Sequence, residues 1–292
     1  MAKPQMEIIA GGKCEEMEIA GRKWEEMEMD CLVCIFSKLN LDDLAVSVPH
    51  VCRSWSAAAR DPLCWRLLDF RSLDFMPWSS FAKRFADRNC VSGFSFAGFM
   101  KLAVRRSAGL ADELRLPELA SIDDLILASN ECPKLTALGL PNLTSDNKAR
   151  IPELISKWKE LKTLAMESKP SKFSQLAYEI AANCKNFKKL VMPASSISKE
   201  DASAIVKCLP NIRILDISRS FLVKEELLFI LEGCRELSRL SAKNCVGFEA
   251  SDGEVRSKGR GIKIFEVEGS KMDDDVWFEI NECDDLQYVH VI

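Results

Sequence analysis

The chain has 292 residues, of which 47% are apolar and 29% are charged, so it can form two folding units with a sizeable core. Its formal net charge of −4 lies entirely within residues 1–30, and the formally neutral remainder argues against nucleic-acid binding. Twelve cysteines without a signal peptide predict an intracellular, reducing location, the cytoplasm or the nucleus, and no apolar run is long enough for a membrane span.

Residues 1–23 combine small residues, a Gly-Gly pair and scattered charges, which predicts a flexible segment. A different pattern begins at residue 24. Four apolar residues have the spacing of one helical stripe: Leu32, Ile35, Phe36 and Leu39. Residues 41–48 predict a second short helix. Residues 51–59 predict a third, which ends before Asp61-Pro62 because a residue before proline disfavours helical dihedral angles. Three helices this short bury little surface, so we expect a partner to pack against them.

Three elements in this region resemble an F-box. In chain order they are Ile35-Phe36-Ser37-Lys38-Leu39, Val51-Cys52-Arg53-Ser54-Trp55 and Cys64-Trp65-Arg66. Over the chain after residue 23, the sequence is similar to plant F-box/leucine-rich-repeat proteins, with residues 24–70 as the F-box. The resemblance implies binding to a Skp-family adaptor and, through it, to cullin and RING subunits. The candidate adaptor-binding residues, divided between internal packing and an adaptor groove, are Met27, Leu32, Ile35, Phe36, Leu44, Val51, Cys52 and Trp55.

The start of this region departs from the usual pattern. F-boxes generally open with a Leu-Pro pair, and Met27-Glu28 stand at that place in this chain. Met27 can supply the apolar contact, but the missing proline removes a preset first turn, so we expect weaker adaptor binding. The alternative is that residues 24–70 form only a helical cap on the rest of the chain.

Residues 71–110 are expected to form an irregular, partly helical connection together with the first repeat. Trp65, Leu68 and Phe70 predict a short strand before it. Ser95 is a candidate N-cap for a helix whose inner face is apolar.

One pattern, apolar-x-x-apolar-x-apolar, recurs through residues 111–292. It is found at Ala111, Leu114, Leu116; Leu135, Leu138, Leu140; Leu161, Leu164, Met166; Phe187, Leu190, Met192; Ile212, Leu215, Ile217; Leu237, Leu240, Ala242; Ile262, Phe265, Val267; and Leu286, Val289, Val291. From residue 135 onward the repeats follow one another every 24 to 26 residues. This period predicts an α/β leucine-rich-repeat solenoid, with parallel strands on the concave side and helices on the convex side.

The segments between the strands predict helices. Ser121 with Asp124, and Ser198 with Asp201, have the spacing of a capping box. Residues 247–261 are polar and glycine-rich, so a loop is expected there in place of a helix. Cys132, Cys184 and Cys234 each precede a strand pattern by three residues, and we interpret them as small apolar core residues.

No pattern for catalysis, a cofactor or a metal emerges. His50 and His290 lie far apart, and no glycine-rich phosphate loop is present. Cys31-x-x-Cys34 has redox or zinc spacing, but it lacks a second pair nearby and was placed on the apolar stripe of a helix, which favours a structural role. A thiol enzyme is a distant alternative, because no base is paired with a cysteine.

Side chains between the repeat leucines should line the concave face and contact a protein target. The candidate target-binding residues are Lys162, Glu167, Lys188, Lys189, Arg213, Asp216, Arg239, Lys243 and Glu266. Residues 148–189 hold ten basic and four acidic side chains, and Lys162, Lys188 and Arg213 occupy one position in consecutive repeats. We hypothesise that this row receives an acidic segment of the target. The alternative is that these flexible side chains only extend into water.

The combined patterns predict a non-catalytic, substrate-recognition subunit of an SCF-type ubiquitin ligase. Such a subunit holds a Skp-family adaptor at one end and an unknown protein target along its repeats, with no nucleic acid and no membrane among its partners. Two alternatives stay open: a repeat scaffold without a ligase, and a small-molecule receptor, for which the solenoid is short and lacks a dedicated anion pocket.

Overall fold

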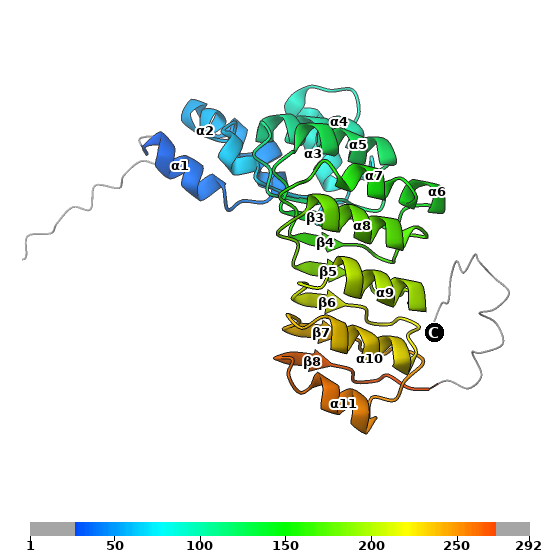
Figure 1. Ribbon diagram of the computed structural model, residues 1–292. Helices are drawn as coiled ribbons and strands as arrows, with labels where there is room; N and C mark the ends of the chain where they lie inside the picture. Colours follow the sequence, from blue (N-terminus) through cyan, green and yellow to red (C-terminus); the bar gives the residue numbers. More distant parts are fainter. Residues whose placement is uncertain (1–26, 273–292) are drawn as a thin grey trace, which may run out of the picture.

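The computed structural model describes residues 27–272 (Figure 1). A group of short helices precedes a parallel sheet whose strands stack in sequence order, with the later helices along one side of it. Two predicted segments lie outside the described residues: the last repeat strand, at 286–292, and the flexible segment at 1–23. Within 27–272 no helix is both long and apolar enough to cross a bilayer.

The N-terminal group has two α-helices joined by tighter and wider helical turns. These elements are α1 (Met29–Phe36), a π-helical turn (Asp43–Ser47), a 3₁₀ turn (Val48–His50), α2 (Arg53–Ala58) and a second 3₁₀ turn (Pro62–Trp65). Leu32, Phe36 and Leu44 are buried between them, and the Phe36 and Trp55 rings meet edge to face with centroids 5.1 Å apart. The Trp65 indole N–H donates to the Ala59 carbonyl at 2.8 Å, which fixes the chain where it enters the sheet.

Eight three-residue strands make one sheet in the described part of the chain. They are β1 (Leu67–Asp69), β2 (Glu113–Arg115), β3 (Ala137–Gly139), β4 (Thr163–Ala165), β5 (Lys189–Val191), β6 (Ile214–Asp216), β7 (Arg239–Ser241) and β8 (Ile264–Glu266). Each pairs in parallel with the next, in the order β1 to β8, which confirms the predicted repeats. The central residue of β1 to β7 is a buried leucine, so the first and third residues face the opposite side, here called the open face.

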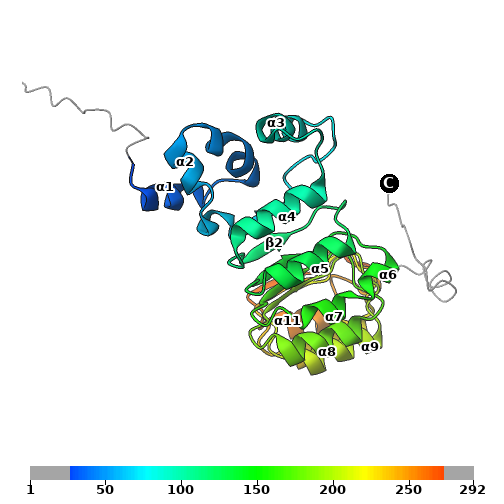
Figure 2. The ribbon, with the colours of Figure 1, turned by 90° about the horizontal axis from the view of Figure 1, so that it is seen from above.

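The helices cover the other side of the sheet. They are α4 (Phe96–Ser107), α5 (Ile122–Glu131), α6 (Ser145–Lys148), α7 (Ile151–Ile155), α8 (Phe173–Asn183), α9 (Lys199–Cys208), α10 (Lys224–Gly233) and α11 (Gly253–Gly259). Figure 2 shows α5, α7, α8 and α9 on one side of the stack, with α1 and α2 projecting outward beside α4 and β2. Both predicted capping boxes are present, at Ser121 with Asp124 and at Ser198 with Asp201.

The first connection is longer than the others and contains α3 (Ser80–Asn89). Its aromatic residues form one cluster with β1 and α4: Phe70, Phe75, Phe81, Phe85, Phe94, Phe96 and Phe99. A guanidinium nitrogen of Arg84 on α3 lies 2.5 Å from a carboxylate oxygen of Asp42, beside the π-helical turn. The irregular connection therefore packs against the solenoid and also contacts the N-terminal helices.

The prediction of a loop at residues 247–261 is wrong, because helix α11 lies within this segment. Asp252 caps this helix by accepting hydrogen bonds from the backbone N–H groups of Glu254 and Val255, and Val255 is fully buried. A Cβ on Gly259 would lie 2.4 Å from the Phe265 ring. Glycine at that position lets the short helix approach the sheet, which a polar, glycine-rich composition alone did not reveal.

The cysteines at the helix ends are core residues, as predicted. Cys132, Cys184 and Cys234 are almost fully buried, and burial raises the pKa of each thiol to about 11. Trp158 occupies the same place in the intervening repeat. Its indole N–H donates to the Cys132 carbonyl at 3.0 Å, and the Cys184 thiol donates to the Trp158 carbonyl at 3.3 Å. These bonds join three consecutive repeats.

Candidate protein-binding surfaces

The N-terminal helices present exposed apolar side chains. Of the predicted adaptor-binding residues, Ile35 and Val51 are 40% and 56% exposed, whereas Met27, Cys52 and Trp55 are half-buried. Leu32, Phe36 and Leu44 are at most 2% exposed and pack inside the unit, so they form the internally packed part of the predicted set. A helix this short needs its strongest apolar residues for its own core, and only the residues beside them remain for a partner.

Sequence reasoning missed other exposed residues of the same unit. Met29 is 43% exposed at the start of α1, and Leu63 is 46% exposed in the last 3₁₀ turn. Cys31 and Cys34 are also exposed, so their placement on the buried stripe of α1 is wrong. The spacing of Met27, Cys31 and Ile35, four residues apart, marks a second apolar stripe that would have revealed this outer face.

At both ends of the open face, charged side chains pair with one another. At the β1 end, Arg115 contacts Asp69 at 2.9 Å and also pairs with Glu113. Burial opposes ionisation of Asp69, but hydrogen bonds from Arg71 and Arg115 outweigh it and lower the pKa of that carboxyl group. At the β8 end, Glu266 pairs with Arg239 at 3.0 Å and with Lys243.

These end groups include three of the predicted target-binding residues, Arg239, Lys243 and Glu266. Hydrogen bonding to Lys243 is the main cause that lowers the pKa of the Glu266 carboxyl group. Because each charge already has a partner, these side chains offer a target less unsatisfied charge than their residue types suggest. The sequence could not reveal this pairing, since Arg239 and Glu266 belong to neighbouring repeats.

The cations at the start of β4 to β6 differ. Lys189 is the first residue of β5, and Lys162, Lys188 and Arg213 directly precede β4, β5 and β6, at the edge of the open face. Lys162, Lys188, Lys189 and Arg213 make no ion pair with any residue in the 27–272 range, and Lys162 and Arg213 are exposed. We call these four residues the basic row. The two remaining candidates lie nearby in the repeats: Glu167 is exposed, and Asp216 accepts a hydrogen bond from the Ser218 backbone N–H at 3.0 Å.

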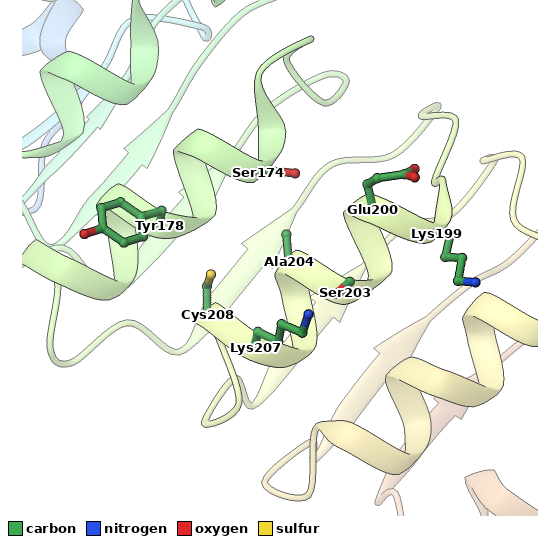
Figure 3. Close-up of a pocket in the computed structure, with 8 residues that line it drawn as sticks. All are labelled: Ser174, Tyr178, Lys199, Glu200, Ser203, Ala204, Lys207 and Cys208. Atoms are coloured by element: carbon green, nitrogen blue, oxygen red, sulfur yellow. The ribbon is translucent and has the colours of Figure 1, made fainter.

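The helical side of the solenoid has an open groove between α8 and α9 (Figure 3). Its volume is about 490 Å³, and its lining includes Tyr178 from α8 together with Ala204 and Cys208 from α9. Lys199 and Lys207 extend from α9 beside it. Small-molecule sites normally enclose most of their ligand, so this solvent-exposed groove does not favour the receptor alternative.

The described residues hold no cluster of three or more His, Cys, Asp or Glu side chains suited to a metal ion. The buried thiols at the helix ends have raised pKa values, which disfavour the reactive thiolate.

Comparison with known proteins gives the same picture. The F-box-like family model matches residues 29–71. F-box/LRR-repeat protein At3g48880 of Arabidopsis thaliana is 33% identical over 245 residues, which cover 81% of this chain and 77% of that protein. Two other Arabidopsis thaliana proteins, F-box protein FBW2 and F-box protein SKIP1, are 25% and 26% identical. Their alignments cover 83% and 81% of this chain, and 74% and 83% of those proteins.

The fold and the family match define a protein that joins an F-box to a stack of leucine-rich repeats. The chain belongs to the F-box/LRR-repeat protein family. The resemblance seen in the Ile35–Leu39 and Val51–Trp55 segments is thereby confirmed.

Proposed function

We propose that this protein is the substrate-recognition subunit of an SCF-type ubiquitin ligase in the cytoplasm or nucleus. Its F-box holds a Skp-family adaptor and, through it, cullin and RING subunits. The open face of the repeats holds a protein target. The chain itself supplies no chemistry.

The exposed apolar side chains of the F-box carry this proposal. Met29, Ile35 and Val51 are each at least 40% exposed on a unit that has few residues for a core of its own. The family match to an F-box implies contact with an adaptor, and these exposed apolar side chains are available for such a contact. The half-buried Trp55, held against Phe36, adds an aromatic anchor of the kind enriched at interfaces.

The mechanism is tethering. A target held on the solenoid stays near the conjugating enzyme that the ligase recruits, which raises the local concentration of its lysines. Such an arrangement requires a stiff connection between the two binding surfaces. The continuous sheet from β1 to β8 and the Arg84–Asp42 ion pair between α3 and the F-box provide one.

The test is direct binding of the full chain to a purified Skp-family adaptor, measured by calorimetry. Replacing both exposed residues, Ile35→Lys with Val51→Lys, should weaken binding by about 2 kcal/mol or more while leaving the melting temperature unchanged. Phe229→Lys is the matched control, because Phe229 is a 44% exposed apolar residue on α10. Absence of binding by the original protein would favour the scaffold alternative, in which the helices never contact a ligase. Equal binding by all three proteins would show that the adaptor does not contact Ile35 and Val51.

A further inference from the structure

The basic row is built into the sheet as consecutive rungs. The backbone N–H of Lys188 donates to the Lys162 carbonyl at 2.9 Å, and the N–H of Arg213 donates to the Lys188 carbonyl at 2.9 Å. Neighbouring strands lie about 4.8 Å apart. Three cationic side chains are therefore held in register on adjacent rungs, with Lys189 beside the middle one.

Cations at this spacing repel one another unless an anion lies between them. At the two ends of the open face, cations are paired with carboxylates of the same chain. Asp69 and Glu113 pair with Arg115 at one end, and Glu266 pairs with Arg239 at the other. Within residues 27–272, the one side-chain hydrogen bond made by the basic row runs from the Lys188 amine to the backbone carbonyl of Asn211, at 3.5 Å. The basic row at β4 to β6 therefore carries positive charge that no carboxylate in residues 27–272 neutralises.

The residues next to the basic row leave room for a chain to lie flat. Gly139 and Ala165 end β3 and β4 on the open face, and Thr163 begins β4. Their small side chains lower the surface between the lysines and the charged groups at the β1 end.

We propose that the basic row docks an extended acidic peptide segment of the target, which crosses the start of β4 to β6 beside Thr163. Alternate side chains of an extended peptide are about 6.6 Å apart, and flexible lysines span the difference from the strand spacing. This inference rests on the proposed function in one respect: that the bound segment belongs to a target of the ligase.

A single-stranded nucleic acid fits this surface less well. Such ligands need exposed aromatic side chains on which bases stack. The aromatic residues in the turns that lead to β4 and β5 are Trp158 and Phe187, which are 0% and 6% exposed. The row therefore supplies charge without stacking surfaces, which matches an acidic peptide.

The test uses the full chain, with and without a purified Skp-family adaptor, and a labelled twelve-residue peptide of alternating glutamate and alanine. Fluorescence anisotropy should show binding that weakens with added salt. The variant Lys162→Glu/Lys188→Glu/Arg213→Glu should bind the peptide about tenfold or more weakly. The control Lys172→Glu/Lys199→Glu/Lys207→Glu makes the same change in net charge at exposed lysines on the helical side and should bind within about twofold of the original protein.

A second variant, Thr163→Trp, places a large side chain between Lys162 and Lys189 without changing charge and should also reduce peptide binding. Thermal melts check that each variant is folded. The proposal is overturned if the peptide does not bind the original protein, if the control loses binding equally, or if an oligothymidine of matched length binds more tightly and is lost with the basic row. Binding of the adaptor is measured in a separate experiment. If the protein binds the peptide but not the adaptor, the proposed function is overturned and the peptide site is retained.

Discussion

Trp158 offers the sharpest test of how the solenoid is held together. Its side chain is fully buried between repeats that otherwise place a cysteine at this position, and its indole N–H satisfies the Cys132 carbonyl. Trp158→Ala should cost about 3 to 5 kcal/mol for the lost contacts and cavity. The unsatisfied carbonyl adds about 1 to 3 kcal/mol to that cost. Trp158→Phe keeps most of the apolar contact and should show mainly the cost of the hydrogen bond.

Urea denaturation followed by circular dichroism measures both variants. Repeats contact only their neighbours, so a defect at this position should uncouple the two halves of the solenoid and split one transition into two. A single transition with a loss of less than about 1 kcal/mol for Trp158→Ala would refute the idea that this ladder of helix ends joins the repeats.

Four further predictions concern local structure and pH. Glu28→Pro should stabilise the F-box by about 0.4 to 1 kcal/mol in thermal melts, because Glu28 has φ −55° before the first turn of α1 and no side-chain cap; a lower melting temperature would contradict it. Ala194→Gly should stabilise the repeats by up to about 1 kcal/mol, since Ala194 has φ +49°. Gly247→Ala should do the opposite, because its Cβ would lie 2.7 Å from the Leu222 carbonyl oxygen. The free energy of unfolding should fall as the pH rises from about 9 to 11, because the thiols ionise at a lower pH in the unfolded chain than when buried. Urea titrations across that pH range check it. The thiols concerned, with pKa values raised from 9.0 to about 11, are those of Cys64, Cys132, Cys184 and Cys234.

The repeat strands could be predicted from sequence because their signal is local and periodic. Each buried leucine, such as Leu164 or Leu190, has a fixed place in a repeat, and the period determines which strands become neighbours. The helix α11 could not be predicted, because it depends on the close approach of Gly259 to Phe265. That contact is a property of the folded stack and leaves no periodic signal.

The division of the F-box residues also required the structure. Ile35 and Phe36 are adjacent and both apolar, yet one is exposed and the other packs against Trp55. Likewise, Lys189 and Arg239 are each the first residue of a strand, β5 and β7, but only Arg239 meets a carboxylate, that of Glu266. Which charged residues remain available to a target follows from contacts across repeats, and a single sequence does not contain them.

The most direct test of the proposed ligase role is proximity labelling in cells with the proteasome inhibited. The intact protein is compared with the Ile35→Lys/Val51→Lys variant, whose solenoid is unchanged. The account predicts that cullin and RING subunits, together with ubiquitin-modified neighbours, are labelled by the intact protein and lost from the variant. Labelling of the same ubiquitin-modified proteins at equal abundance by both would contradict it.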